Sequence, residues 1–116
     1  MNTNPLAVRP GYESLAFVLN AALEQAQEGK GKERHASGEP FERQKICEIT
    51  RRVGLGGPAF QVVKKTEEAV RLLERGNPAQ AVEDLLGAIN YAAAMVILVQ
   101  EQSQEKLLEH DDHWGA

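Results

Sequence analysis

The stretch NPAQAVEDLLGAINYAAAMVILV, residues 77–99, decides the fold. It opens with Asn77 and Pro78, which suit the N-cap and the first position of a helix. The stretch before it, KKTEEAVRLLERG at residues 64–76, ends on Gly76, a residue favoured just after a helix C-terminus. Gly-Asn-Pro between two periodic stretches therefore predicts two antiparallel helices joined as a hairpin.

Working outward from this hairpin, apolar periodicity predicts four helices and no strands. They run over about 12–28, 40–53, 58–76 and 77–108, with the sequence GLGGP at 54–58 separating the second from the third. At 116 residues the chain fits a single domain. We expect an all-α, four-helix arrangement with a C-terminal hairpin, and flexible ends at 1–11 and 109–116.

Each helix has an apolar stripe that we expect to face inward. The expected inward residues are Leu15, Val18, Leu19, Ala22 and Ala26 in the first helix and Phe41, Ile46, Ile49 and Val53 in the second; Val63, Thr66, Ala69, Val70 and Leu73 in the third; and Leu85, Ala88, Ile89, Ala92, Val96 and Val99 in the fourth. The opposite side of the fourth helix is nearly as apolar. This helix is therefore either central or part of an oligomer interface.

Composition and charge restrict the class of protein. The net charge is −4, but residues 30–75 hold 11 Lys and Arg against 7 Asp and Glu, and the rest holds 2 against 10. A basic middle in an acidic chain favours a local anion site over duplex nucleic acid, although ordinary surface patterning is the alternative. The single cysteine, Cys47, fits a reducing, cytoplasmic setting. The apolar run 85–99 is shorter than the roughly 20 residues that span a bilayer, so we expect no membrane insertion.

Two carboxylate pairs are the main candidate functional residues. Glu67 and Glu68 lie in the third helix, Glu83 and Asp84 in the fourth. The helical wheel places Glu67 at the edge of the buried face and Glu68 toward solvent. The alternative for Glu67 is a surface charge ladder with its neighbours in the helix.

Asn90 has two interpretations. It is either a hydrogen-bonded core amide that fixes helix register or, in a column with Glu83, part of a binding site.

Three further segments are weaker candidates. Arg34 and His35 in the loop at 30–35 could bind phosphate, the GLGGP segment could bind an anion or be a plain connector, and HDDHW at 110–114 has metal-ligand spacing.

The predicted hairpin, about residues 58–99, resembles the core of the MazG-type all-α nucleoside triphosphate pyrophosphohydrolases. The segments ERHASGEPF, KKTEEAVRLL and EDLLGAINY resemble small phage proteins. The MazG-type resemblance implies Mg²⁺ held by E-x-x-E on one helix and E-x-x-D on the next. Here Glu67 is followed three residues later by Val70 and Asp84 by Gly87, so neither motif is complete and one acid per motif carries over.

Three functional hypotheses follow. The first is non-catalytic binding of a nucleotide-like or phosphorylated ligand by a homo-oligomer without a cofactor, with sequestration of that ligand as one use. Its expected ligand-binding residues are Arg34, His35, Lys64, Lys65, Glu67, Glu83, Asn90 and Tyr91. The second is a Mg²⁺-dependent nucleotide pyrophosphohydrolase with Glu67, Glu68, Glu83 and Asp84 as metal ligands. The third is a protein-interaction module that docks through its fourth helix.

Overall fold

All regular secondary structure in the part of the chain that the structure describes is helical. This computed structural model describes residues 7–29 and 38–115, with side chains up to residue 106. Its elements are α1 (Glu13–Glu28), a short 3-10 helix η1 (Phe41–Arg43), α3 (Lys45–Val53), α4 (Gly56–Glu74) and α5 (Pro78–Gly115). The described part contains four α-helices and no strand, which confirms the all-α expectation.

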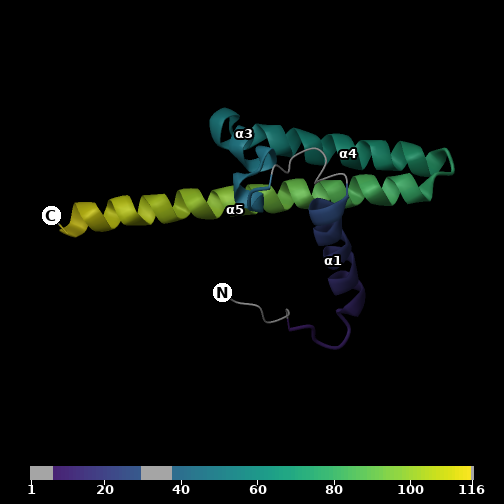
Figure 1. Cartoon of the computed structure of the whole chain (residues 1–116), viewed down its shortest axis with the longest axis horizontal. Helices are drawn as coiled ribbons and strands as arrows, with labels where there is room; N and C mark the ends of the chain where they lie inside the picture. Colours follow the sequence, from purple (N-terminus) through teal and green to yellow (C-terminus); the bar gives the residue numbers. More distant parts are fainter. Residues whose placement is uncertain (1–6, 30–37, 116) are drawn as a thin grey trace.

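Helix α5 is the central element of the molecule. Its 38 residues correspond to about 57 Å at 1.5 Å per residue and account for the longest molecular extent of 62 Å. Helix α4 lies along the N-terminal part of α5, and α3 covers its middle (Figure 1). The C-terminal end of α1 packs against α5, and the N-terminal part of α1 projects away from it (Figure 1). The result is an elongated molecule in which α5 contacts each of the other α-helices.

The turn between α4 and α5 has the predicted geometry. Gly76 has φ of 77°, a left-handed conformation that suits glycine. The Asn77 amide donates to the Leu72 carbonyl at 2.8 Å and the Gly76 amide to the Leu73 carbonyl at 3.1 Å, which together form a Schellman motif. The Asn77 side chain then caps α5 by accepting a hydrogen bond from the Gln80 amide at 3.3 Å.

Three helix boundaries differ from the prediction. The second predicted helix is divided at Gln44, whose ψ of 167° is extended, into η1 and α3. Helix α4 begins at Gly56, before the expected Pro58, because a proline without an N–H is tolerated in the first turn of a helix. Helix α5 continues to Gly115 instead of ending near Leu108.

The buried core is small and rich in alanine. Ile46, Cys47, Ala94 and Leu98 form its main cluster, where α3 meets α5, and Phe41, Leu55 and Tyr91 pack against it. Apart from Pro58, the remaining buried apolar residues in the described part of the chain are alanines: Ala22, Ala69, Ala81 and Ala88. Small side chains let helix axes approach closely, so the contacts within this chain are tight but bury little large apolar surface.

The predicted inward faces of α4 and α5 are wrong in large part. On α4, Val63, Val70 and Leu73 are more than half exposed, and the face against α5 is centred on Lys65 and Ala69. On α5, the expected core residues Leu85, Val96 and Val99 are exposed; Ala88 is buried as predicted. The wheel correctly found apolar stripes and the buried Ala69, but α4 and α5 meet mainly through alanines and the Lys65 stem, while most of their large apolar residues face away from each other.

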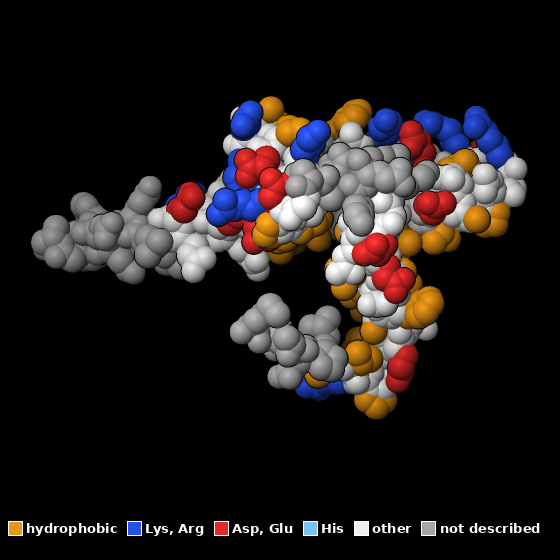
Figure 2. Space-filling view, in the orientation of Figure 1, with side chains coloured by type: hydrophobic (Ala, Val, Ile, Leu, Met, Phe, Trp, Pro, Cys, Tyr) orange, Lys and Arg blue, Asp and Glu red, His pale blue; other side chains and the backbone are white. Residues whose placement is uncertain are grey.

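The same correction applies to the other helices. Leu15, Val18 and Leu19 of α1 and Ile49 and Val53 of α3 are exposed, whereas Ala22 and Ile46 are buried as expected. Figure 2 shows apolar side chains gathered along α1 and along the edge of α5 from which α1 leaves. Most large apolar side chains therefore lie on the outer surface of this chain.

Candidate functional site

A groove of about 840 Å³ lies between α1, η1 and α5. Its wall is mainly apolar, with Leu23 from α1, Phe41 from η1 and Ile97 from α5. The amides of Gln27, Gln44 and Asn90 and the carboxyl groups of Glu28 and Glu39 provide its polar groups. Among the described residues that line it, none is a Lys or Arg. This groove could hold an apolar or base-like group against amide side chains, and its described wall offers no cation for a phosphate.

Of the predicted site residues that the structure describes, Asn90 alone lines this groove. Its amide nitrogen donates to the Ala22 carbonyl at 3.0 Å and lies 3.4 Å from the Gln25 side-chain oxygen. Gln25 in turn donates to the backbone carbonyl of Glu83 at 2.9 Å. The Glu83 and Asn90 column therefore holds α1 against α5. Sequence reasoning missed Gln25, because spacing within one helix does not reveal which helix its glutamines will meet.

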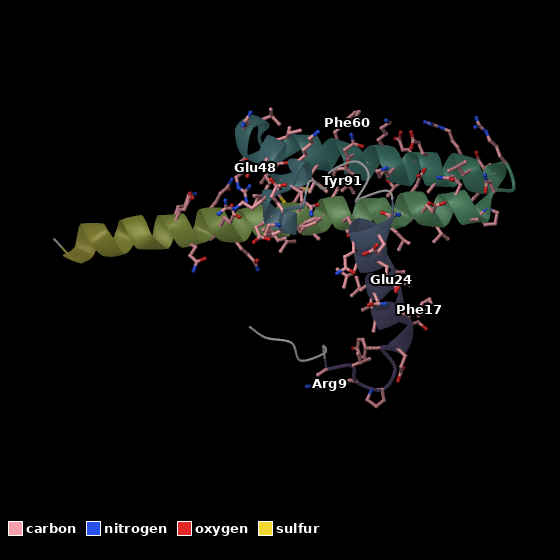
Figure 3. All side chains as sticks on the ribbon, in the orientation of Figure 1. Arg9, Phe17, Glu24, Glu48, Phe60 and Tyr91 are labelled. Carbon is pink, nitrogen blue, oxygen red and sulfur yellow. The ribbon has the colours of Figure 1, made fainter. Side chains whose placement is uncertain are left out.

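Lys65 and Tyr91 lie between α4 and α5. Lys65 is only 8% exposed, and its Nζ is 5.9 Å from the centre of the Tyr91 ring, within cation–π range. The lysine stem lies against Gly87, where a Cβ would come within 3.2 Å of its Cδ and Cε. Figure 3 shows Tyr91 between the two helices, whereas Phe60 points outward from α4. Gly87 thus permits the close packing of a buried lysine stem.

The acidic residues of α4 lie in ladders of charge along the helix surface. Glu67 is 3.7 Å from Arg71, and Glu68 is 4.0 Å from Lys64. The predicted order of exposure is reversed, because the Glu67 side chain is 64% exposed and that of Glu68 is 38% exposed. The buried face of α4 is centred on Lys65 and Ala69 and not on the predicted apolar stripe, so Glu67 lies on the outer side of the helix.

The predicted residues therefore do not converge on one site. Glu83 is exposed and Asp84 half-buried on α5, and no cluster of three or more His, Cys, Asp or Glu that could hold a metal ion occurs among the described residues. Arg34 and His35 lie outside the described residues, as do the side chains of the HDDHW segment.

In the GLGGP segment, Gly54 closes α3 with a φ of 98°, and its amide donates to the Thr50 carbonyl. This part of the segment is a helix stop.

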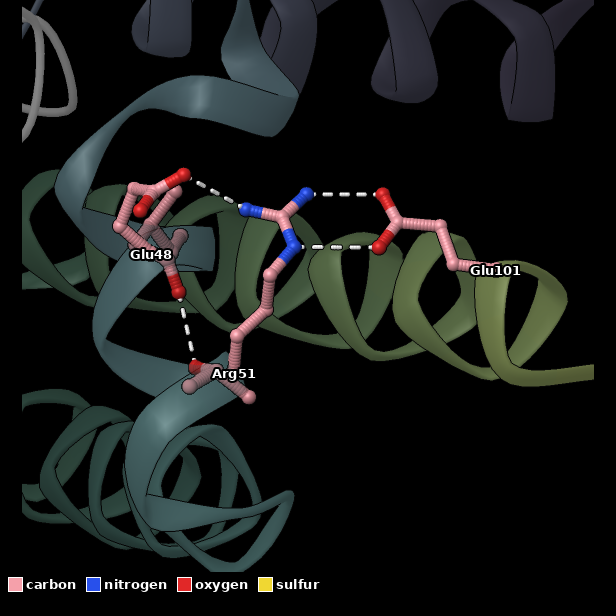
Figure 4. A network of polar contacts seen from close by, with 5 residues as sticks. Glu48, Arg51 and Glu101 are labelled. Carbon is pink, nitrogen blue, oxygen red and sulfur yellow. Dashed lines mark hydrogen bonds and ion pairs between the residues drawn. The ribbon is translucent and has the colours of Figure 1, made fainter. Parts of the chain in front are cut away.

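An ion-pair network that the sequence did not predict joins α3 to α5. Arg51 donates to both carboxylate oxygens of Glu101, at 3.1 and 2.7 Å, and to Glu48 at 2.9 Å (Figure 4). The hydrogen bonds from Arg51 lower the pKa of the Glu101 carboxyl. Because a bidentate pair fixes orientation as well as distance, this network sets the position of α3 on α5.

One described helical segment, Pro78–Lys106 of α5, is long and apolar enough to cross a membrane by length and composition alone. In its most apolar window, 22% of the residues are buried within the molecule.

Comparison with protein-family models, curated proteins and solved structures found no match to this chain. The structural class that the fold defines is an elongated all-α protein organised on one long helix.

Proposed function

We propose that this protein is a helical interaction module that acts by associating with other polypeptide chains through apolar helix faces. One observation carries the proposal. Among the described residues the large apolar side chains lie mainly outside, while five of the buried apolar residues, Ala22, Ala69, Ala81, Ala88 and Ala94, are alanines. Extended exposed apolar surface of this kind is typical of protein–protein contact surfaces.

The shape of the chain supports the same proposal. Its radius of gyration is 16.9 Å, whereas a compact domain of this length would have about 13 Å. Helix α1 leaves α5 after a short contact, and Phe17, 75% exposed, points away from it (Figure 3). An arm of this kind would gain stability by packing on another chain.

Native mass and hydrogen exchange of the purified protein test this proposal. We expect a mass above that of one chain, with slow exchange along α1 or α5 that becomes faster on dilution. A single-chain mass over the whole accessible concentration range, together with no partner bound stoichiometrically in cells, would contradict it. Leu73→Glu on α4 and Leu85→Glu on α5 then distinguish which exposed face is used.

Binding of a nucleotide-like ligand is the second candidate, favoured by the groove beside Asn90. Its volume of about 840 Å³ falls within the range of about 300–1,000 Å³ common for small-molecule sites. A thermal-shift panel of nucleotides with and without Mg²⁺ tests it. We expect stabilisation by a ligand that is recovered intact, and loss of that stabilisation in Ala93→Trp, which fills the groove. Turnover with Mg²⁺ that Glu83→Ala abolishes would instead establish a pyrophosphohydrolase.

A further inference from the structure

Helix α5 is contacted by α4, α3 and α1 within the described part of the chain. One face, with Ala81 and Ala88, lies against α4, and a second, with Asn90, lies against α1. At 100° per residue Asn90 lies roughly 160–180° from Ala88 and Ala81, and the residues that pack on α3, Ala94 and Leu98, fall between them on one side. The arc on the other side is therefore left for a further contact. On that arc Leu85, Val96 and Val99 are exposed, and Ile89 is half-buried at the edge of the groove beside α1.

This arc carries a continuous apolar seam, which we name the α5 seam. It consists of Val82, Leu85, Ile89, Ala92, Val96 and Val99. Val82, Leu85, Val96 and Val99 are 53%, 39%, 55% and 45% exposed. Successive members are 3, 4, 3, 4 and 3 residues apart, which is the a/d spacing of a coiled coil. Ser103 and Lys106 occupy the next seam positions, so the seam ends at Val99.

The residues beside the seam are suited to an identical partner. The flanking coiled-coil positions between residues 81 and 102 hold only Ala, Leu, Met and Gln, so two seams would meet without like-charge repulsion. Glu83, Asp84 and Glu101 lie on the other sides of the helix. Ala81 and Ala88 are already buried against α4, so a second helix would approach the seam on its other flank, at Leu86, Ala93 and Gln100.

The seam is also self-complementary when reversed. The spacing of the seam residues is symmetric about a point between Asn90 and Tyr91, so it is unchanged when the helix direction is reversed. In antiparallel pairing Ile89 would face Ala92, so that a large side chain packs on a small one, and Leu85 would face Val96. Parallel pairing would place Ala92 opposite Ala92 and leave a gap. A self-complementary patch is what a two-fold interface requires.

We propose that two copies of this chain pair through their α5 seams as an antiparallel, two-fold coiled coil. This inference rests on the proposed function and identifies its partner as a second copy. A lipid bilayer fits the seam less well, because α4 runs beside it and exposes Lys64, Glu67 and Arg71 on its outer surface. In the pair, Val82 of one copy lies next to Val99 of the other.

Cysteine cross-linking tests both the seam and its direction. Val82→Cys and Val99→Cys variants, one carrying a tag that changes its mass, are oxidised separately and after mixing. We expect about tenfold more disulfide-linked dimer in the mixture than in either variant alone, because a disulfide forms only where Cβ atoms are about 4 Å apart. Cross-linking of each variant with itself, and not in the mixture, would mean parallel pairing and overturn the proposal.

A charge variant with a matched control gives the second test. Leu85→Glu places two carboxylates in the proposed interface, so we expect the dimer dissociation constant to rise about 100-fold or more. Leu73→Glu makes the same substitution at an exposed leucine of α4 and should change the dimer dissociation constant by no more than about threefold. Circular dichroism verifies that both variants remain helical.

The possible outcomes separate this inference from the proposed function. An oligomer that persists in Leu85→Glu and gives no 82-to-99 cross-link overturns the α5 seam while the interaction module stands. A single-chain mass for the unmodified protein and no bound partner overturn both. Flotation of the protein with neutral phosphatidylcholine vesicles, abolished by Leu85→Glu, would identify a membrane as the occupant and likewise overturn the pairing.

Discussion

At the scale of single residues, Cys47 has an environment that suppresses its chemistry. It is fully buried, and burial raises the pKa of its thiol, with the nearby Arg51 charge opposing this only in part. Because the thiolate is the reactive form, native Cys47 should react poorly with electrophiles. Cys47 is therefore a buried core thiol with its thiolate form disfavoured.

We predict that iodoacetamide labels native Cys47 at least about tenfold more slowly than an exposed thiol, and at the ordinary rate in denaturant. Ser14→Cys on the exposed surface of α1 provides that reference thiol within the same molecule. Mass spectrometry of the two labelled peptides measures both rates. Equal rates under native conditions would mean that the α3/α5 core is open.

Glu101 predicts a dependence of stability on pH. Its pKa is lowered in the folded protein by the hydrogen bonds from Arg51, so folding favours its charged form. The stabilisation is therefore fully present above the ordinary glutamate pKa of about 4.3 and is lost as pH falls through the lower, folded value.

We therefore expect Glu101→Gln to lower the free energy of unfolding at pH 7, with a difference from the unmodified protein that shrinks below about pH 4.3. Urea unfolding at several pH values measures this difference. Glu105→Gln, one turn later on α5, is the control and should have little effect. A difference that stays constant down to strongly acidic pH would rule out the Arg51 pair as its source.

At the scale of elements, the turn at 75–77 was predictable because its signals are local. The left-handed Gly76 and the capping Asn77 depend on backbone sterics and on hydrogen bonds to residues within one turn of helix. The faces of α4 and α5 were not predictable. A wheel ranks residues by hydrophobicity, whereas the buried face of α4 includes Lys65 beside the predicted Ala69, and that of α5 includes Ala81, because these residues let the two helices approach closely.

Gly76→Ala should destabilise the protein by about 1 kcal/mol, since a Cβ is disfavoured at positive φ. A Cβ there would meet no atom within 4 Å, so the cost comes from the backbone alone. Denaturant unfolding provides the measurement, with Gly56→Ala at the exposed start of α4 as the comparison. No loss of stability in Gly76→Ala would contradict the left-handed conformation.

Asn90→Ala should loosen α1 without unfolding α4 and α5. It removes the hydrogen bond to the Ala22 carbonyl, which we expect to contribute about 0.5–1.5 kcal/mol. Hydrogen exchange should become faster across residues 13–28 and remain unchanged in α4. Uniformly faster exchange would instead mean that Asn90 supports the whole fold.

At the scale of the whole molecule, apolar side chains remain exposed on α1, α4 and α5, and self-association links stability to protein concentration. We predict that the melting temperature rises with concentration for the unmodified protein and for Leu73→Glu, and is constant for Leu85→Glu. Differential scanning calorimetry over a hundredfold concentration range measures this. A constant melting temperature in all three would exclude pairing as a source of stability.

The sequence by itself determined the helical class, four α-helices within the described residues and the turn that joins α4 to α5. These depend on apolar periodicity and on caps such as Asn77, which act over a few residues. Only the tertiary structure decided which faces meet: that Asn90 binds the backbone of α1, that Lys65 is buried against Gly87, and that the α5 seam is left uncovered. The physical reason is that helix pairing depends on the fit between two surfaces distant in sequence, and a wheel describes only one of them at a time.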